Sequence, residues 1–410
     1  FEASSIRQVG NKYVMVFSGY SGPDYGLGST NSALRYAFGD TPLGPWRSGG
    51  VLVDSRGVVP NEDGSHLITP NAAHNTHGSI QEINGQWYVF YHRPPRGFGN
   101  ARQPMVAPLK ITWDKKKVAD GGMVKIVAYD AKKNEWTAAA SDGMTYTGAE
   151  VTSEGFQIFG LPPYRYYSAG LACYMSDTQW MQDNHDCWNN SMDLKDIKDG
   201  GIVGFKYFGF GGLTKDAKGV KAFEGSRKGD GTMLNIFLTP SGKGAFKIRV
   251  MLDGPYVNAD WKGREIAVIN VPADAKAEMQ NYKVAVPAVE GLSGKHAIYL
   301  VAEGADCLFT LHGIGFSKNN ITLEQPIVPS VTITADGKQL NIPNTPIFCT
   351  NANGLTDTKH YQVYAPLKDN SVLKVTATDP SIKVEISPIV MGRATIKCSY
   401  LGLEKTYLIN

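Results

Sequence analysis

The strongest constraint on the fold is a series of short strand-forming runs that turn residues interrupt at close intervals. Each run is rich in β-branched or aromatic residues and is bounded by Gly, Pro, Asn or Asp. In the first part of the chain these runs cover residues 13–17, 33–37, 50–54, 79–83, 86–91 and 105–111. Almost no segment has the apolar spacing of a long amphipathic helix. With 45 glycines, 22 prolines, 20 tyrosines and 16 phenylalanines, the chain is predicted to be all-β with tight connections.

Two of these regions repeat one pattern. Residues 6–17 resemble residues 80–91, because each has a strand, a two-residue turn and an aromatic-rich strand. The turns are Gly10-Asn11 and Asn84-Gly85, which favour hairpins. A repeated antiparallel unit of this kind is typical of a propeller blade. A third blade is expected around residues 44–46.

The rest of the chain continues the strand pattern without the blade repeat. Six short runs between residues 201 and 311 predict a β-sandwich. Residues 319–329 resemble a linker, and four further runs predict a small immunoglobulin-like sandwich of about 85 residues. We therefore expect domains at 1–145, 146–318 and 319–410.

Charge and hydropathy exclude several functional classes. Lys and Arg number 41 against 38 Asp and Glu, so the main reason to propose nucleic-acid or anionic-membrane binding is missing. No apolar run approaches the roughly 20 residues of a membrane-spanning helix. The five cysteines lack zinc-site spacing. We expect buried free thiols, with disulfides Cys173–Cys187 or Cys349–Cys398 as the alternative in an exported protein.

Five passages over residues 1–112 occur in an order that resembles glycoside hydrolase family 43. They are FEASSIR with GNKY (1–13), LRYA (34–37), PLGPW (42–46), NTHGS (75–79) and YHR followed by ARQ (91–103). The resemblance implies a five-bladed β-propeller and an inverting hydrolase that removes α-L-arabinofuranosyl or β-xylosyl units from plant polysaccharides. The N-terminal blades of such a propeller are missing from this sequence. We therefore expect a fragment, or a separate chain or segment that supplies the missing blades.

The same resemblance implies roles for individual residues. An inverting glycosidase needs a protonated carboxyl group and a second carboxylate roughly 6.5–9.5 Å away. Glu2 matches the general acid, although a lone glutamate is more often a solvated side chain. The base Asp and the pKa-modulating Asp are expected upstream of residue 1. The aspartates of this segment, namely Asp24, Asp40, Asp54 and Asp63, match neither motif.

Further site residues follow from the same alignment of motifs. His77 matches a channel histidine that binds a hydrated cation, usually Ca2+, with a buried structural histidine as the alternative. Arg102 matches a sugar-binding arginine, with a strand-surface arginine as the alternative. Tyr25, His92 and Phe98 are weaker candidates for walls of the sugar subsites.

The second domain resembles a family 6 carbohydrate-binding module of Bacteroides-type proteins, which implies a jelly-roll β-sandwich. The matching passages are GFKYFGF (204–210), KIRVMLDGP (247–255) and GKHAIYLV (294–301). Candidate sugar-stacking aromatics are Trp180, Trp188, Tyr256 and Trp261. Trp261 is the strongest candidate for exposure because its loop, residues 258–263, is polar. The alternative is that the module only buttresses the catalytic domain. A second calcium site in the sandwich is also expected.

These expectations leave more than one function open. The alternatives are a β-galactosidase that acts on galactan side chains and a non-catalytic glycan-binding protein. In each case the partner is a plant cell-wall oligosaccharide or polysaccharide, without nucleic acid or a membrane span. The expected location is bacterial: periplasmic, outer-membrane-associated or secreted.

Overall fold

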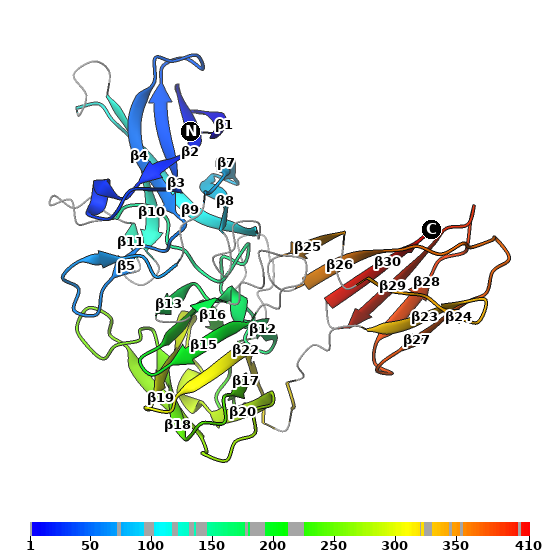
Figure 1. Cartoon of the computed structure of the whole chain (residues 1–410). Helices are drawn as coiled ribbons and strands as arrows, with labels where there is room; N and C mark the ends of the chain where they lie inside the picture. The colour runs from blue at the N-terminus through cyan, green and yellow to red at the C-terminus, as the bar shows by residue number, and fades with distance from the viewer. Residues whose placement is uncertain are drawn as a thin grey trace.

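The computed structural model confirms an all-β chain and divides it into three groups of sheets (Figure 1). It describes residues 2–71, 75–93, 102–116, 122–130, 135–136, 146–176, 179–180, 193–211, 225–319, 321–323, 330–343, 347–352, 356–400 and 403–410. We call the groups the first unit (β1–β11), the second unit (β12–β22) and the third unit (β23–β30). None of the short helical turns in this part of the chain has the length or apolar character that a bilayer crossing needs.

The first unit begins with a four-stranded antiparallel meander. Its strands lie in chain order: β1 (Glu2–Val9), β2 (Lys12–Ser21), β3 (Thr30–Gly39) and β4 (Arg47–Asp54). Val9 pairs with Lys12, so Gly10-Asn11 is the predicted two-residue turn. Alternate side chains of β2 are buried, with Val14 and Val16 fully inside. This alternation places one face of the sheet on the core.

A second meander follows and has the same order of strands. It contains β7 (Gly78–Ile83), β8 (Gln86–Arg93), β9 (Gln103–Asp114), β10 (Met123–Asp130) and the short β11 (Glu135–Trp136). Asn84 and Gly85 both have positive φ, at 53° and 82°. Only a turn with two left-handed residues matches the twist of a tight hairpin, and Asn-Gly favours that turn. The predicted hairpin is therefore present.

The two meanders pack against one another, and a third blade is not seen between them. Buried residues of both sheets form one cluster, which also includes Ala149, Val151 and Cys173 from the segment that follows. Residues 44–46, where a third blade was expected, lie in the connection between β3 and β4. The only strands between β4 and β7 in the described residues are the short β5 (Val59–Pro60) and β6 (Leu67–Ile68). The prediction of three blades is thus wrong for the described residues, which form two blade-like sheets.

The second unit consists of two antiparallel sheets around one large core. One sheet runs β14 (Gln179–Trp180), β15 (Leu194–Lys198), β22 (Leu308–Ser317), β17 (Met233–Pro240) and β20 (Gln280–Ala285), with β12 (Tyr166–Ser168) also paired to β22. The other runs β13 (Tyr174–Ser176), β16 (Ile202–Gly211), β21 (Gly294–Glu303), β18 (Phe246–Leu252) and β19 (Arg264–Val271). The core cluster draws on both sheets, for example Phe205, Phe208 and Phe316. In the part of the chain that the structure describes, strands of the first and second units are also connected by single helical turns at Pro23–Tyr25, Ala169–Leu171 and Pro287–Val289.

The third unit has a core of its own. Its smaller sheet contains β23 (Val331–Ala335), β24 (Lys338–Gln339) and β27 (Leu373–Ala377). Its larger sheet contains β25 (Phe348–Ala352), β26 (Thr356–Val363), β30 (Leu403–Ile409), β29 (Ala394–Tyr400) and β28 (Lys383–Ile386). Strands β26 and β30 are parallel, and the other pairs are antiparallel. Ile333, Val363 and Ile396 are fully buried between the two sheets.

The cysteines that the structure describes in full lie in the cores of the units. Cys173, Cys307 and Cys398 are buried free thiols. The Cys349–Cys398 disulfide is therefore not formed. The alternative Cys173–Cys187 disulfide is likewise not formed, because Cys173 is free. Burial raises the pKa of the Cys398 thiol to about 11, which keeps it protonated and unreactive near neutral pH.

Candidate active site

The strands of the two meanders bring five polar side chains to one end of the first unit. Glu2 begins β1, and Asn75 and His77 precede β7. His92 lies near the end of β8 and Arg102 directly before β9. Antiparallel neighbours present the start of one strand beside the end of the next, so these positions meet at one edge. The Ser5 and Ser79 hydroxyl oxygens, 2.8 Å apart, join β1 to β7.

Glu2 lies at the centre of the group. Its Oε1 accepts a hydrogen bond from Asn75 Nδ2 at 2.8 Å and lies 3.3 Å from His77 Nε2. Asn75 Nδ2 is also 3.2 Å from His77 Nε2. The Glu2 side chain is 58% exposed, so the site is open to solvent on this side. Of the predicted site residues, Glu2, His77, His92 and Arg102 are therefore brought together.

His92 connects this group to Arg102. Its Nε2 accepts the backbone N–H of His77 at 3.1 Å, and Arg102 Nη1 lies 3.2 Å from the same nitrogen. The His77 and His92 rings meet edge to face, with centroids 5.3 Å apart. Burial, followed by the positive charge of Arg102 and then His77, lowers the pKa of His92 to about 4. At neutral pH His92 is an uncharged acceptor that fixes the loop carrying His77.

The environment of Glu2 favours its ionised form. Hydrogen bonds from Asn75 and from His77, together with the charge of His77, hold the pKa of Glu2 below its ordinary value. A general acid needs the opposite shift, because it must be protonated at working pH. No hydrogen bond or ion pair among the described residues joins Glu2 to another carboxylate. The described residues thus place donors around the Glu2 carboxylate and do not include a group that would raise its pKa.

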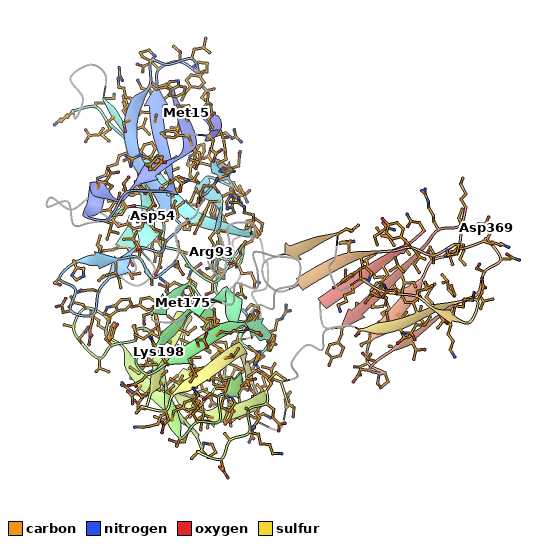
Figure 2. All side chains as sticks on the ribbon, viewed as in Figure 1. Met15, Asp54, Arg93, Met175, Lys198 and Asp369 are labelled. Atoms are coloured by element: carbon orange, nitrogen blue, oxygen red, sulfur yellow. The ribbon has the colours of Figure 1, made fainter. Side chains whose placement is uncertain are left out.

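The nearby aspartates have partners elsewhere. Asp54 is fully buried, and its Oδ2 lies 2.6 Å from Arg56 Nη2 and accepts the Ser21 hydroxyl at 3.1 Å. Figure 2 labels this residue at the end of β4. Asp24 is paired with Arg35. Such buried or paired carboxylates stabilise the sheet.

Tyr25 is part of the Asp54 cluster and does not form a subsite wall. It is 3% exposed, its hydroxyl donates to Asp54 Oδ2, and its ring meets Tyr146 edge to face. A buried ring with a fully engaged hydroxyl has no surface to offer a sugar. Phe98, the other aromatic candidate, lies outside the described residues.

Trp261 is likewise buried, and its predicted exposure is wrong. Its side chain is 3% exposed and contacts the rings of Tyr174, Tyr256 and Tyr299. The indole Nε1 donates to the Asn61 carbonyl at 2.8 Å, from the hairpin between β5 and β6. The polar residues of the loop serve the same contact, since Asn258 Nδ2 donates to the Glu62 carbonyl at 2.6 Å. The loop therefore docks on the first unit.

The other aromatics proposed for the second unit are less informative. Tyr256 is partly buried beside Trp261. Trp188 lies outside the described residues, as does the side chain of Trp180. Their predicted contact with sugar stays a prediction.

The donor set does not by itself form a calcium site. Ca2+ takes six to eight oxygen ligands, whereas the site offers one carboxylate and an imidazole. Among the described residues, no group of three or more His, Cys, Asp or Glu side chains is placed to hold a metal ion. Calcium stays a prediction, and His77 is better explained as a partner of Glu2.

The sequence analysis quoted Asn75 within a motif but did not select it as a site residue. A signal was available, because residues i and i+2 of an extended chain point to the same side. If His77 points into a site, the side chain of Asn75 is therefore expected to point to the same side. Its contact with Arg102, 27 positions away, could not be predicted from spacing.

The curated proteins similar in sequence to this chain are named as xylosidases or arabinosidases. No family model matches the chain. A xylosidase/arabinosidase of Thermoclostridium stercorarium is 24% identical over 331 residues, covering 74% of this chain and 54% of the relative. A xylosidase/arabinosidase of Bacteroides ovatus is 28% identical over 130 residues, covering 32% of this chain and 31% of the relative. The chain thus spans about half the length of the first relative and less of the second.

Among solved structures, a family 43 arabinoxylan arabinofuranohydrolase from Bacillus subtilis aligns over 78% of this chain and 54% of its own, at 19% identity. Its TM-score of 0.35 is too low to support an argument from the superposition. The sequence relatives carry the assignment. The chain is a relative of bacterial xylosidases and arabinosidases, as its resemblance to glycoside hydrolase family 43 predicts.

Proposed function

We propose that the chain is part of an inverting glycoside hydrolase that removes α-L-arabinofuranosyl or β-xylosyl units from plant polysaccharides. The observation that carries the proposal is the convergence of Glu2, His77 and Arg102 at one edge of the first unit. These residues are up to 100 positions apart in sequence and come from three strand ends. Their meeting gives a carboxyl group surrounded by donors, in a chain whose relatives are xylosidases and arabinosidases.

In the proposed reaction Glu2 protonates the leaving glycosidic oxygen while a second carboxylate activates water. That base would lie roughly 6.5–9.5 Å from Glu2. A further carboxylate near Glu2 would raise its pKa, since like charges disfavour ionisation. Both groups would come from outside the described residues. Arg102 would donate hydrogen bonds to sugar hydroxyls, as a guanidinium with several N–H groups can.

The proposed architecture extends the observed sheets. The two meanders of the first unit would be blades of a five-bladed propeller, since both consist of antiparallel strands in chain order, four in the first and four plus the short β11 in the second. The second unit would be a jelly-roll sandwich of the family 6 type and the third an immunoglobulin-like sandwich. The burial of Trp261 favours a buttressing role for the second unit at that loop, so glycan binding there is not part of the proposal.

Two accessory expectations belong to the same proposal. A calcium ion in the propeller channel would need oxygen ligands and water in addition to His77. An enzyme that acts on plant cell-wall polysaccharide would work outside the bacterial cytoplasm, in the periplasm, on the outer membrane or in the medium. The β-galactosidase activity and non-catalytic glycan binding are the competing functions.

Glu2→Gln tests the proposal in the protein that contains these 410 residues. The substitution keeps the shape of the side chain and removes the proton donor. Hydrolysis of p-nitrophenyl α-L-arabinofuranoside or β-xyloside should fall by about two to four orders of magnitude. Glu82→Gln, an exposed residue of β7, is the matched control and should leave the rate unchanged. Full activity of the Glu2 variant would remove Glu2 from the acid role.

A substrate panel separates the competing functions. Turnover of p-nitrophenyl β-galactoside in place of the pentosides would favour the β-galactosidase alternative. Binding of xylo-oligosaccharides without hydrolysis of any aryl glycoside would favour a non-catalytic protein.

A further inference from the structure

The two oxygens of the Glu2 carboxyl group are not equivalent. Both hydrogen-bonding contacts that the described residues make with this group involve Oε1, from Asn75 Nδ2 at 2.8 Å and His77 Nε2 at 3.3 Å. No hydrogen bond or ion pair among the described residues involves Oε2. A proton on the carboxyl group therefore has one oxygen that is already occupied by donors and one that is open.

The orientation of the Asn75 amide is determined by its two neighbours. Arg102 Nη1 donates to Asn75 Oδ1 at 3.0 Å, and a guanidinium can only donate. The amide oxygen must therefore face Arg102, which turns the NH2 group towards Glu2. A flipped amide would place its oxygen against the carboxylate and its NH2 against the guanidinium. Arg102 thus fixes the orientation of the amide, because only its oxygen can accept from the guanidinium.

We propose that Asn75 is a positioning residue which, held in one orientation by Arg102, keeps Oε1 of Glu2 as an acceptor and directs the transferable proton to Oε2. The inference rests on the proposed role of Glu2 as the acid. The inference identifies Oε2 as the oxygen that gives up the proton, and it assigns this selection to Asn75 and Arg102.

The proton transfer balances without any further reactant. The glycosidic C–O bond breaks, its electron pair stays on the leaving oxygen, and that oxygen takes the proton from Oε2. The attacking water bonds to the anomeric carbon and loses its proton to the base carboxylate. Negative charge develops on Glu2 during this step, and the donors already aimed at Oε1 stabilise it without reorganisation.

The direct test is the pKa of Glu2 in the 410-residue chain, measured by 13C NMR of labelled glutamate carboxyl groups. The Glu2 signal is identified by its absence in Glu2→Gln. Asn75→Ala removes the donor, so the pKa of Glu2 should rise towards its ordinary value. Arg102→Met should also raise it, because the amide is then free to flip. In the Asn75→Ala background, Arg102→Met should have no further effect.

Controls separate this chain of contacts from a general effect of charge or folding. Arg7→Met removes an arginine of β1, whose Nη1 donates to the neighbouring Ile6 carbonyl, and should leave the pKa of Glu2 unchanged. If Asn75→Ala does not fold, Arg102→Met alone and with Asn75→Ser gives the same comparison. An unchanged pKa in Asn75→Ala or Asn75→Ser would overturn the inference. So would an equal effect of Arg102→Met with and without Asn75, since Arg102 would then act by charge alone.

Activity gives a second readout in the protein that contains this chain. Asn75→Ala should lower kcat by about tenfold with KM unchanged, the effect of one hydrogen bond used in the transition state. The two proposals fail differently. If Glu2→Gln remains active while Asn75→Ala shifts the pKa, only the catalytic role of Glu2 fails. If Glu2→Gln is inactive and the pKa does not move, only the role of Asn75 fails.

Discussion

Replacing Trp261 by alanine should destabilise the contact between the first and second units more than any change at an exposed aromatic. The side chain is 3% exposed and packs in a cluster that joins Val59 of the first unit to Tyr174 and Tyr299 of the second. A tryptophan buries about 150–250 Å2, which at about 25 cal/mol per Å2 corresponds to about 4–6 kcal/mol. Measured Trp→Ala changes in cores cost about 3–5 kcal/mol. We expect a loss within that range.

Trp261→Phe separates the contribution of ring packing from that of the indole hydrogen bond. It keeps most of the ring and removes the indole N–H that donates to the Asn61 carbonyl. The lost hydrogen bond should cost about 1 kcal/mol. Trp113→Ala is the matched control, because Trp113 is only partly buried in β9 and stacks with Lys12.

Urea unfolding with native-state hydrogen exchange provides the assay. Trp261→Ala should lower the midpoint and release protected amides in residues 59–68, where Asn61 donates its N–H to the His66 carbonyl. Unchanged exchange in this hairpin, together with a stability loss below about 1 kcal/mol, would refute the burial argument. A xylo-oligosaccharide that protects Trp261 from quenchers would restore the sugar-stacking role.

Two further changes test other buried groups. Asp54→Ala should lower the free energy of unfolding by about 3–5 kcal/mol, because it leaves Arg56 buried without its carboxylate. Asp24→Ala breaks the exposed pair with Arg35 and should lower it by less than about 1 kcal/mol. Equal urea midpoints for the two variants would contradict this. The pKa of His92 is lowered to about 4, so the unfolded chain binds a proton before the folded chain does, and stability should fall as the pH drops from about 6.5 towards 4. His92→Gln should flatten that part of the pH–stability curve, and an unchanged slope would show that burial and the charges of Arg102 and His77 do not hold the ring neutral.

Local signals in the sequence predicted the strands and the hairpins well. The alternation in β2 and the Asn84-Gly85 turn depend only on neighbouring residues, and both are present. The prediction of a third blade is wrong because the Gly-Pro segment at residues 44–46 connects β3 to β4. The number of sheets depends on pairing between distant strands, which local patterns do not encode.

The site was predicted in part for a similar reason. Family motifs located Glu2, His77 and Arg102, and the structure brings them together. Tyr25 and Trp261 were misplaced because their partners, Asp54 and Asn61, lie 29 and 200 positions away. A polar loop around an aromatic residue predicts exposure only when nothing docks on that loop.

Arg93, the residue after His92, links the candidate site of the first unit to the backbone of the second unit. Successive strand residues point to opposite sides, and Arg93 is buried with Nη1 and Nη2 donating to the carbonyls of Ala172 and Leu171 at 3.1 and 2.8 Å (Figure 2). A recombination event that exchanged the second unit for an unrelated module would leave this guanidinium without acceptors in an apolar setting. It would also loosen the strand end that carries His92. The two units are therefore expected to be inherited together.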